Sequence, residues 1–211
     1  MRGLLLTMTE PRPEDEAEFN AWYDTEHLPE RRGIPGFFSA RRWIAVDAQP
    51  GAGKYLGTYE LARPEVLDSA PYLAHFGDGQ SPWSQRNLGR CTVFRRWACE
   101  QILPGDAPPA PGASGLFLAC GDVPAEHEAE FNRWYDEEHV PLLATVPGVL
   151  AARRFRARSG SPRYIALYDL ADLAAPQRPE WQSALATPWS KRIDSLTQDA
   201  EWILRTYRAC Q

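Results

Sequence analysis

Two histidines of this chain stand in nearly the same sequence, His27 at the end of EAEFNAWYDTEH and His139 at the end of EAEFNRWYDEEH. An imidazole titrates near neutral pH, so it can accept or donate a proton without a cofactor. Helical spacing puts the residues three, four and seven positions earlier on adjoining parts of the same surface. The candidate catalytic residues are therefore His27, Tyr23, Asp24 and Asn20 in the first segment, and His139, Tyr135, Asp136 and Asn132 in the second.

These side chains offer a base, a phenol that donates a hydrogen bond and an amide that can hold a carbonyl group, while Asp24 could orient His27. A site that enolises a ketone or opens a lactone needs such parts. Trp22 and Trp134 are candidate substrate-binding residues. A structural reading stays open, because a histidine at a helix C-terminus interacts favourably with the helix dipole and the aromatic residues could simply be core.

The two segments belong to a longer internal repeat with an offset of 112 residues. Over residues 16–42 against 128–154, 16 of the 27 positions are identical. A second echo, SPWSQR at 81–86 against TPWSKR at 187–192, has an offset of 106. The repeat is half the chain long, too long for a solenoid unit, so it predicts two fused copies of one small domain.

Hydrophobic periodicity and turn signals predict the same elements in each copy. In the first copy we expect strands at 3–8, 37–46, 54–61 and 92–103, with helices at 13–28, ending near Pro29, and at 64–76. In the second copy we expect strands at 115–120, 149–157, 163–170 and 200–209, with helices at 126–140 and at 179–196, broken at Pro188. This order, β-α-β-β-α-β, is the ferredoxin-like one.

The predicted fold class is α+β, with tandem ferredoxin-like halves at 1–103 and 115–211. Residues 104–114, PGDAPPAPGAS, predict a semi-extended linker between them. Each sheet needs a cover on the face without helices, and sheets pack face to face. We therefore expect the two sheets to face each other as an intramolecular α+β barrel.

Composition excludes several classes of function. A net charge of −5 gives no electrostatic reason to expect nucleic acid. No stretch of about 20 apolar residues predicts a membrane span, and no signal peptide is evident. The four cysteines lack a CxxC spacing and read as free thiols, so we expect a cytoplasmic protein. No HxxxH spacing is present, so no metal site is expected. The sequence also contains no phosphate loop and no nucleophile elbow.

Three further acidic or basic positions are ambiguous. Glu26 and Glu138 fall on the apolar face of their helices, and a buried carboxylate needs a partner, for which Arg41 or Arg42 could serve Glu26. His75 has no counterpart in the second half, so it is a candidate substrate-binding residue of the first half, or else a surface histidine at a helix end.

The string F-N-x-W-Y-x-x-E-H-x-P, followed by PG and a strand, resembles the EthD-like branch of the dimeric α+β-barrel proteins. It occurs twice, as FNAWYDTEHLP and FNRWYDEEHVP. The resemblance implies a barrel that other members build by pairing two copies, so this chain would be a pseudo-dimer, with a homodimer of the whole chain left open. That wider group includes polyketide cyclases, muconolactone isomerases, cofactor-free monooxygenases and, in distant branches, heme enzymes.

Two hypotheses follow. The first is a cofactor-independent enzyme, an isomerase, cyclase, lyase or monooxygenase, that moves a proton on a small hydrophobic or aromatic carbonyl compound; no cofactor is expected, although the family leaves room for heme. The second is a binding or structural protein whose pockets hold a small apolar ligand or nothing. His75 and the glycines of HFGDGQ favour the first half as the working one, with Trp181 and Leu185 plugging the second.

Overall fold

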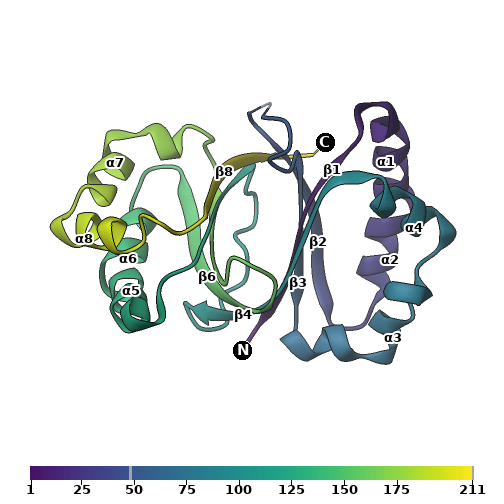
Figure 1. Cartoon of the computed structure of the whole chain (residues 1–211), viewed down its shortest axis with the longest axis horizontal. Coiled ribbons are helices and arrows are strands. Elements are labelled where there is room, and N and C mark those ends of the chain that lie inside the picture. Colours follow the sequence, from purple (N-terminus) through teal and green to yellow (C-terminus); the bar gives the residue numbers. More distant parts are fainter. Residues whose placement is uncertain (48, 211) are drawn as a thin grey trace. The chain divides into compact units, whose positions relative to one another are not determined.

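The computed structural model describes residues 1–47 and 49–210. The chain divides into two compact units. Among these residues, the first unit comprises 1–47, 49–100, 158–160 and 210, and the second comprises 101–157 and 161–209. Both mix α and β structure in the order expected from the repeat (Figure 1). Each unit is described by itself below.

The first unit contains a four-stranded antiparallel sheet in the order β4-β1-β3-β2. Its helical elements lie on one face of these strands (Figure 1). The strands are β1 (Gly3–Pro11), β2 (Phe37–Ala45), β3 (Tyr55–Leu61) and β4 (Cys91–Leu103). The main helical elements are α1 (Glu16–Trp22), η2 (Tyr23–His27), α2 (Leu28–Gly33), η3 (Pro64–Asp68), α3 (Ala70–Leu73) and α4 (Pro82–Gly89).

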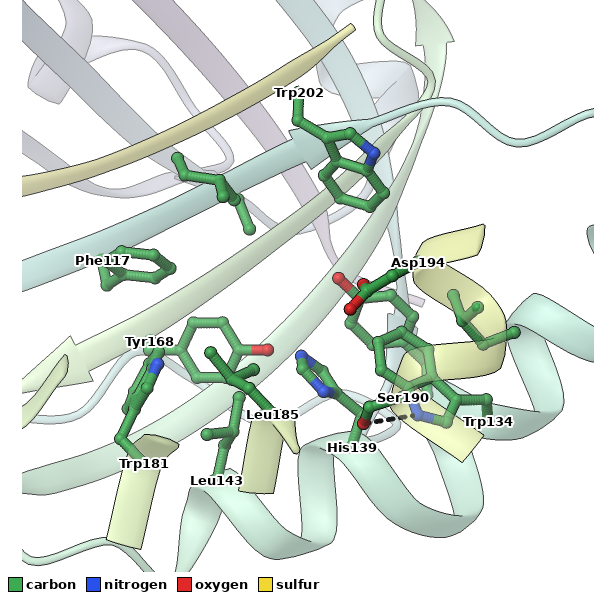
Figure 2. Close-up of a pocket in the computed structure, with 14 residues that line it drawn as sticks. Phe117, Trp134, His139, Leu143, Tyr168, Trp181, Leu185, Ser190, Asp194 and Trp202 are labelled. Carbon is green, nitrogen blue, oxygen red and sulfur yellow. Dashed lines mark hydrogen bonds between the residues drawn. The ribbon is translucent and has the colours of Figure 1, made fainter. Parts of the chain in front are cut away.

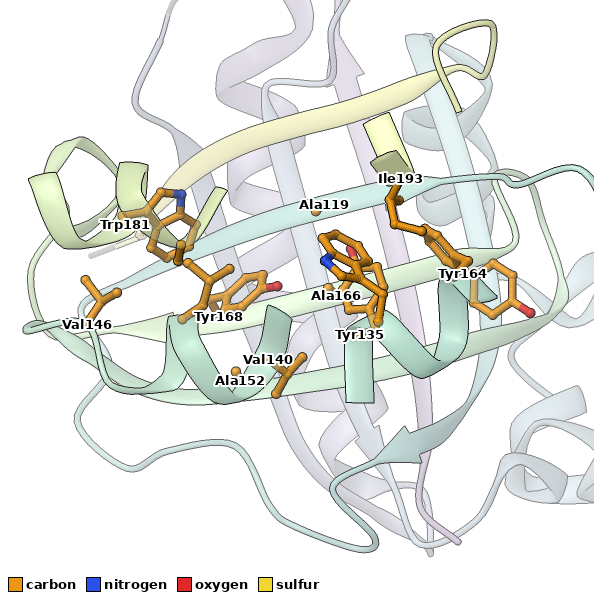
Figure 3. Close-up of a cluster of buried hydrophobic side chains, with 14 of the residues drawn as sticks. Ala119, Tyr135, Val140, Val146, Ala152, Tyr164, Ala166, Tyr168, Trp181 and Ile193 are labelled. Carbon is orange, nitrogen blue, oxygen red and sulfur yellow. The ribbon is translucent and has the colours of Figure 1, made fainter. Parts of the chain in front are cut away.

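The second unit repeats this sheet in the order β8-β5-β7-β6. The strands are β5 (Gly115–Gly121), β6 (Val149–Ser159), β7 (Tyr164–Leu170) and β8 (Trp202–Ala209). The main helical elements are α5 (Glu128–Trp134), η6 (Tyr135–His139), α6 (Val140–Ala144), α7 (Pro179–Leu185) and α8 (Pro188–Leu196). An apolar cluster that includes Tyr135, Tyr168 and Trp181 fills the space between its helices and its strands (Figure 3).

The registers of the two sheets correspond residue by residue. Leu61 pairs with Gly3 in β1, and Leu170 pairs with Gly115 in β5. The first ladder to β2 shifts between Phe37 and Ser39, and the ladder to β6 shifts between Val149 and Ala151. The same irregularity at the same place makes the positions of β3 and β7 directly comparable, with Tyr59 matched to Tyr168.

The expected end of the first helix near Pro29 is wrong. Residues 23–27 form a π-helical turn, in which the backbone N–H of Leu28 donates to the carbonyl of Tyr23, and α2 then continues to Gly33. Pro29 is the second residue of α2, directly after the π turn, and the chain accommodates it without ending the helical run. The second unit contains the same π turn at Tyr135–His139.

The second helical region of the first unit is shorter and more divided than the expected 64–76. It consists of η3 and α3, and the SPWSQR echo forms a separate helix, α4, that we did not assign. Ser81 caps α4, because its hydroxyl accepts from the backbone N–H of Ser84 at 2.9 Å. Thr187 caps α8 in the same way, also at 2.9 Å from Ser190, and the break at Pro188 is confirmed.

The Pro/Gly-rich segment 104–114 lies against the second unit. The backbone N–H of Ala110 donates to the carboxylate of Asp169 at 2.9 Å, and Gln101 donates to the carbonyl of Ala107 at 3.0 Å. The N–H of Ser114 donates to the carbonyl of Leu170 at 2.9 Å. These bonds to strand residues fix the segment on the unit that it precedes.

Candidate functional site

The π turn of each unit brings its tyrosine and its histidine together in the interior. Tyr23 and His27 lie edge to face with ring centroids 4.9 Å apart, and Tyr135 and His139 lie 4.8 Å apart in the same arrangement. All four side chains are buried. Because a π turn inserts an extra residue into the helix, it changes which side chains share a face, and such turns are frequent at functional sites.

A tryptophan packs on each imidazole. The ring centroids are 4.6 Å apart for Trp22 and His27, and 4.1 Å apart for Trp134 and His139. Trp22 donates to the hydroxyl of Ser84 at 3.0 Å, and Trp134 donates to that of Ser190 at 3.3 Å. Both tryptophans, proposed as substrate-binding residues from the sequence, therefore line the histidine sites and are held by a serine.

The asparagines and aspartates of the repeat do not join the histidines. Arg154 donates to Asp136 at 3.0 Å and to Asn132 at 2.9 Å, while its guanidinium lies 3.9 Å from the ring centroid of Tyr135. Arg42 contacts Asp24 at 3.4 Å and also bonds Asn20. These residues form an arginine clamp between helix and strand, so the expectation that Asp24 orients His27 finds no contact in the structure.

Glu26 and Glu138 brace helix against helix. Glu26 accepts from Trp22 at 3.2 Å and from Ser84 at 3.1 Å, and it also bonds Ser81. Glu138 accepts from Thr187 at 2.6 Å. Hydroxyl and indole donors hold these carboxylates, and Arg42, one of the two arginines expected as a partner of Glu26, is engaged in the clamp instead.

His75 lies outside both histidine sites. Its Nδ1 is 3.2 Å from the carboxylate of Glu30, its side chain is 43% exposed, and it does not line the cavity beside His27. Its backbone carbonyl accepts from Arg31 at 2.9 Å. The surface reading of His75 fits this position, and the structure does not bring it to the other candidates.

In the first unit a hydrogen-bonded triad closes the site. The hydroxyl of Tyr59 lies 3.0 Å from Nε2 of His27 and 2.5 Å from the hydroxyl of Tyr23. The remaining cavity has a volume of about 40 Å³. Burial raises the pKa of Tyr59 well above its usual value, and burial together with Arg31 lowers the pKa of His27 well below its own. The triad is therefore neutral, and Nδ1 of His27 is the ring nitrogen that has no hydrogen-bond partner among the described residues.

In the second unit the same residues line an open cavity. It has a volume of about 380 Å³, and its walls are mostly aromatic and aliphatic (Figure 2). Trp181 and Leu185, expected to plug this space, form part of its wall, so the first-half preference does not fit the cavity sizes. The lining residues are Phe117, Ala119, Trp134, Tyr135, His139, Leu143, Tyr168, Trp181, Leu185, Ser190, Ile193, Asp194, Trp202 and Leu204.

Three polar groups converge on this cavity. The hydroxyl of Tyr168 points toward the ring of His139 (Figure 2), yet neither that hydroxyl nor Nδ1 of His139 has a hydrogen-bond partner among the described residues. Asp194 adds a carboxylate from α8. A buried polar atom without a partner costs about 1–3 kcal/mol. A ligand that supplies an oxygen atom would remove this cost.

Burial sets the protonation states. It lowers the pKa of His139 to about 3, with Arg154 adding to the effect, and raises the pKa of Tyr135 to about 12. Desolvation also raises the pKa of Asp194 above its usual value. At neutral pH the cavity thus presents a neutral imidazole and protonated phenols, which can accept and donate hydrogen bonds without any buried charge.

One difference between the two sites is a methyl group on the third strand. A Cβ on Gly57 would lie 2.5 Å from the hydroxyl of Tyr23, so only glycine permits the Tyr23–Tyr59 bond. By register the matching residue of β7 is Ala166, which belongs to the same buried cluster as Tyr135 (Figure 3). By analogy with Gly57, we expect its methyl group to oppose the corresponding approach of Tyr135 to Tyr168.

Sequence reasoning missed Tyr59 and Tyr168. Both lie on the third strand of their unit, far in sequence from the histidines. One signal could have found them, since KYLGTYEL and RYIALYDL carry two tyrosines at the same spacing in both copies. The strand alternation then places both tyrosines of each pair on one face of the sheet.

Among the described residues the cavity wall holds no lysine or arginine to pair with the propionates of a heme, so the residues present fit that group poorly. Among the described residues no group of three or more histidines, cysteines and carboxylates could hold a metal ion.

Comparison with known proteins identifies the fold. No protein family and no curated protein matches the sequence. Solved structures do match over nearly the full length. A proposed monooxygenase from Fusobacterium nucleatum is 10% identical with a TM-score of 0.64, over 100% of this chain and 93% of that one. An anthrone oxidase-like protein is 14% identical with a TM-score of 0.63, over 100% and 91%.

A chlorite dismutase variant from Candidatus Nitrospira defluvii, crystallised with cyanide, is 8% identical with a TM-score of 0.62, over 98% of this chain and 90% of that one. At such identities the likeness concerns the fold and not the reaction. Within residues 1–47 and 49–210 there is also no helix with the length and apolar character of a membrane span.

Proposed function

We propose that the second unit is a cofactor-independent enzyme site in which His139 moves a proton on a small hydrophobic or aromatic carbonyl compound. The observation that carries the proposal is the apolar cavity of about 380 Å³ with the unpartnered groups of His139 and Tyr168 on its wall. A carbonyl oxygen bound there would accept from a tyrosine hydroxyl, and the apolar walls would hold the rest of the molecule.

The chemistry is enolisation. Neutral His139 takes a proton from the carbon beside the carbonyl, the C–H electron pair forms the enolate, and the oxyanion accepts hydrogen bonds from Tyr168 or Tyr135. The pKa of about 3 describes the cavity without a ligand. An oxyanion next to the imidazole favours its protonated form, so the base becomes stronger as charge develops. The enolate can then be reprotonated elsewhere, cyclise or react with dioxygen.

The similar structures support this class of reaction without fixing it. Monooxygenase and anthrone oxidase-like proteins share the fold. Within it, the EthD-like branch is our proposed assignment, because FNxWYxxEHxP occurs at matching positions of both units. We likewise propose that the chain is a tandem fusion of two ferredoxin-like copies. The expected face-to-face packing of the sheets stays a prediction.

A second candidate is ligand binding without turnover. The observation that favours it is the same depressed pKa of His139, which makes the imidazole a weak base until a ligand arrives. The two candidates differ in one measurable way, since only an enzyme exchanges the acidic carbon-bound protons of its ligand.

The test uses 1-tetralone and anthrone as probes. Binding is followed by quenching of tryptophan fluorescence, because Trp134, Trp181 and Trp202 line the cavity. Proton transfer is followed by nuclear magnetic resonance as exchange into D₂O. We expect His139→Ala to lower the exchange rate by about 10²-fold, the scale of a general base, and the matched His27→Ala to change it little.

Other outcomes discriminate clearly. Equal losses in both variants would indicate two working sites, and loss from His27→Ala alone would contradict the assignment. Quenching without exchange in the wild-type protein would favour the binding protein.

A further inference from the structure

The small cavity of the first unit differs from that of the second in charge, not only in size. Its volume is about 40 Å³, and two guanidinium groups, Arg31 and Arg96, are part of its wall together with the hydroxyls of Thr7 and Thr9. No carboxylate lines it. A space lined by cations and hydroxyl donors, with no acid among its described lining residues, has the polarity of an anion site.

Arg31 is the central observation. Its side chain is only 5% exposed. One terminal nitrogen, Nη2, is occupied: it donates to the carbonyl of His75 at 2.9 Å and lies 3.6 Å from Glu30, which also contacts His75. The other, Nη1, is buried and has no hydrogen-bond partner. A guanidinium has five N–H donors and no acceptor, so only an acceptor such as an anion or a water can satisfy Nη1.

Thr9 supplies an independent sign. It lies on β1, is 2% exposed, and its hydroxyl has no hydrogen-bond partner. Arg96, on the neighbouring strand, is held in place because it donates to the hydroxyl of Tyr72 at 3.1 Å and lies over the ring of Phe76. Two unsatisfied donors and a second positioned cation therefore surround one space.

The second unit lacks all of these groups. By strand register Thr9 corresponds to Gly121 and Arg96 to Leu204, and by the repeat Arg31 corresponds to Leu143. A buried cation is expensive to keep without compensation. The second unit has the same arrangement of strands and helices with a leucine, Leu143, at the position of Arg31. The fold of the first unit therefore does not require an arginine at this position.

We infer that the first unit binds a small monovalent anion in this cavity, held by Arg31 Nη1 and the hydroxyl of Thr9. The anion is of halide size or is the carboxylate head of a small acid. The volume sets this limit: it exceeds the roughly 10–15 Å³ that one water requires, but it is about a tenth of the cavity beside His139. The site is separate from the proposed enzyme site and does not depend on it.

Chloride is the first probe, detected by the broadening of its ³⁵Cl resonance when it exchanges with the protein. We expect saturable broadening in the wild-type protein and at least a tenfold weaker apparent affinity in Arg31→Leu, which copies the residue of the other unit. Arg192→Leu is the control, because it removes the same charge from an exposed ion pair with Glu130, and it should bind chloride as the wild type does.

Formate distinguishes the two kinds of anion. Formate that displaces chloride removes the excess broadening of the ³⁵Cl resonance. Displacement at formate concentrations below the chloride concentration would assign the site to a carboxylate head, and displacement only at higher formate concentrations would assign it to a halide. Because Arg31→Leu could fail to fold, Thr9→Val provides a second variant. Crystals of the wild-type protein soaked in bromide provide a direct test that needs no variant. Anomalous scattering from bromide should lie beside Arg31 and Thr9. No saturable broadening, or no bromide in this cavity, would overturn the inference.

Discussion

The two units share the same arrangement of strands and helices and differ in the size and lining of the cavity beside the histidine. Both place a tyrosine, a tryptophan and a histidine on a π turn, and both lock helix to strand with an arginine clamp. In the first unit the hydroxyl of Tyr59 fills the space and bonds Nε2 of His27, whereas in the second the hydroxyl of Tyr168 has no partner among the described residues and a large cavity remains. Nδ1 has no such partner in either histidine. Retention of the same histidine is therefore no sign of the same role.

The largest expected difference concerns Gly57 and Ala166. Gly57→Ala should destabilise the protein by about 3 kcal/mol, because the new methyl group would lie 2.5 Å from the hydroxyl of Tyr23 and disrupt the triad. Ala166→Gly should lose about 1 kcal/mol, the usual effect of glycine in a strand. Urea denaturation measures both. Equal losses would show that the methyl group does not distinguish the sites.

The next difference concerns the two strand tyrosines. Tyr59→Phe should lose about 2 kcal/mol, because it removes a buried hydroxyl that bonds His27 and Tyr23. Tyr168→Phe should raise the stability by about 1 kcal/mol, because it removes a buried hydroxyl that has no partner among the described residues, yet it should weaken binding of the ketone probes. A comparable loss of stability in the two variants would mean that Tyr168 is satisfied in solution.

The last expected effect is a dependence on pH, to which both units contribute. Burial lowers the pKa of His139 to about 3 and that of His27 well below its usual value, whereas both titrate near 6.5 when the chain unfolds. Between pH 6.5 and 5 the unfolded chain binds the extra protons, so stability falls as the pH falls, by up to about 1.4 kcal/mol per pH unit for each histidine.

His139→Gln and His27→Gln should each remove one histidine's share of this slope. Only His27→Gln should also lower the stability at pH 7, since it loses the bond to Tyr59. Denaturation curves at pH 5 and pH 7 separate the two effects. An unchanged slope in His139→Gln would show that this imidazole is not shielded from solvent.

The repeat and the hydrophobic periodicity predicted the element order and the pairing of tyrosine with histidine, because these depend on local spacing. They did not predict the partners of Asn20, Asp24 and Glu26, which depend on how helices and strands meet. Nor could they find the triad in advance: the bond between Tyr23 and Tyr59 depends on the register of β3 and on the missing side chain of Gly57. Helix α4 escaped notice because it is short and mostly polar.

The π turn also bears on the order of events in the proposed tandem fusion. A π turn arises when one more residue is accommodated within an otherwise α-helical run. Both copies contain it at positions that differ by the offset of the repeat, Tyr23–His27 and Tyr135–His139. Two independent insertions at one point are far less economical than one. Under the tandem fusion proposed above, the extra residue was therefore already present in the single domain before it was doubled.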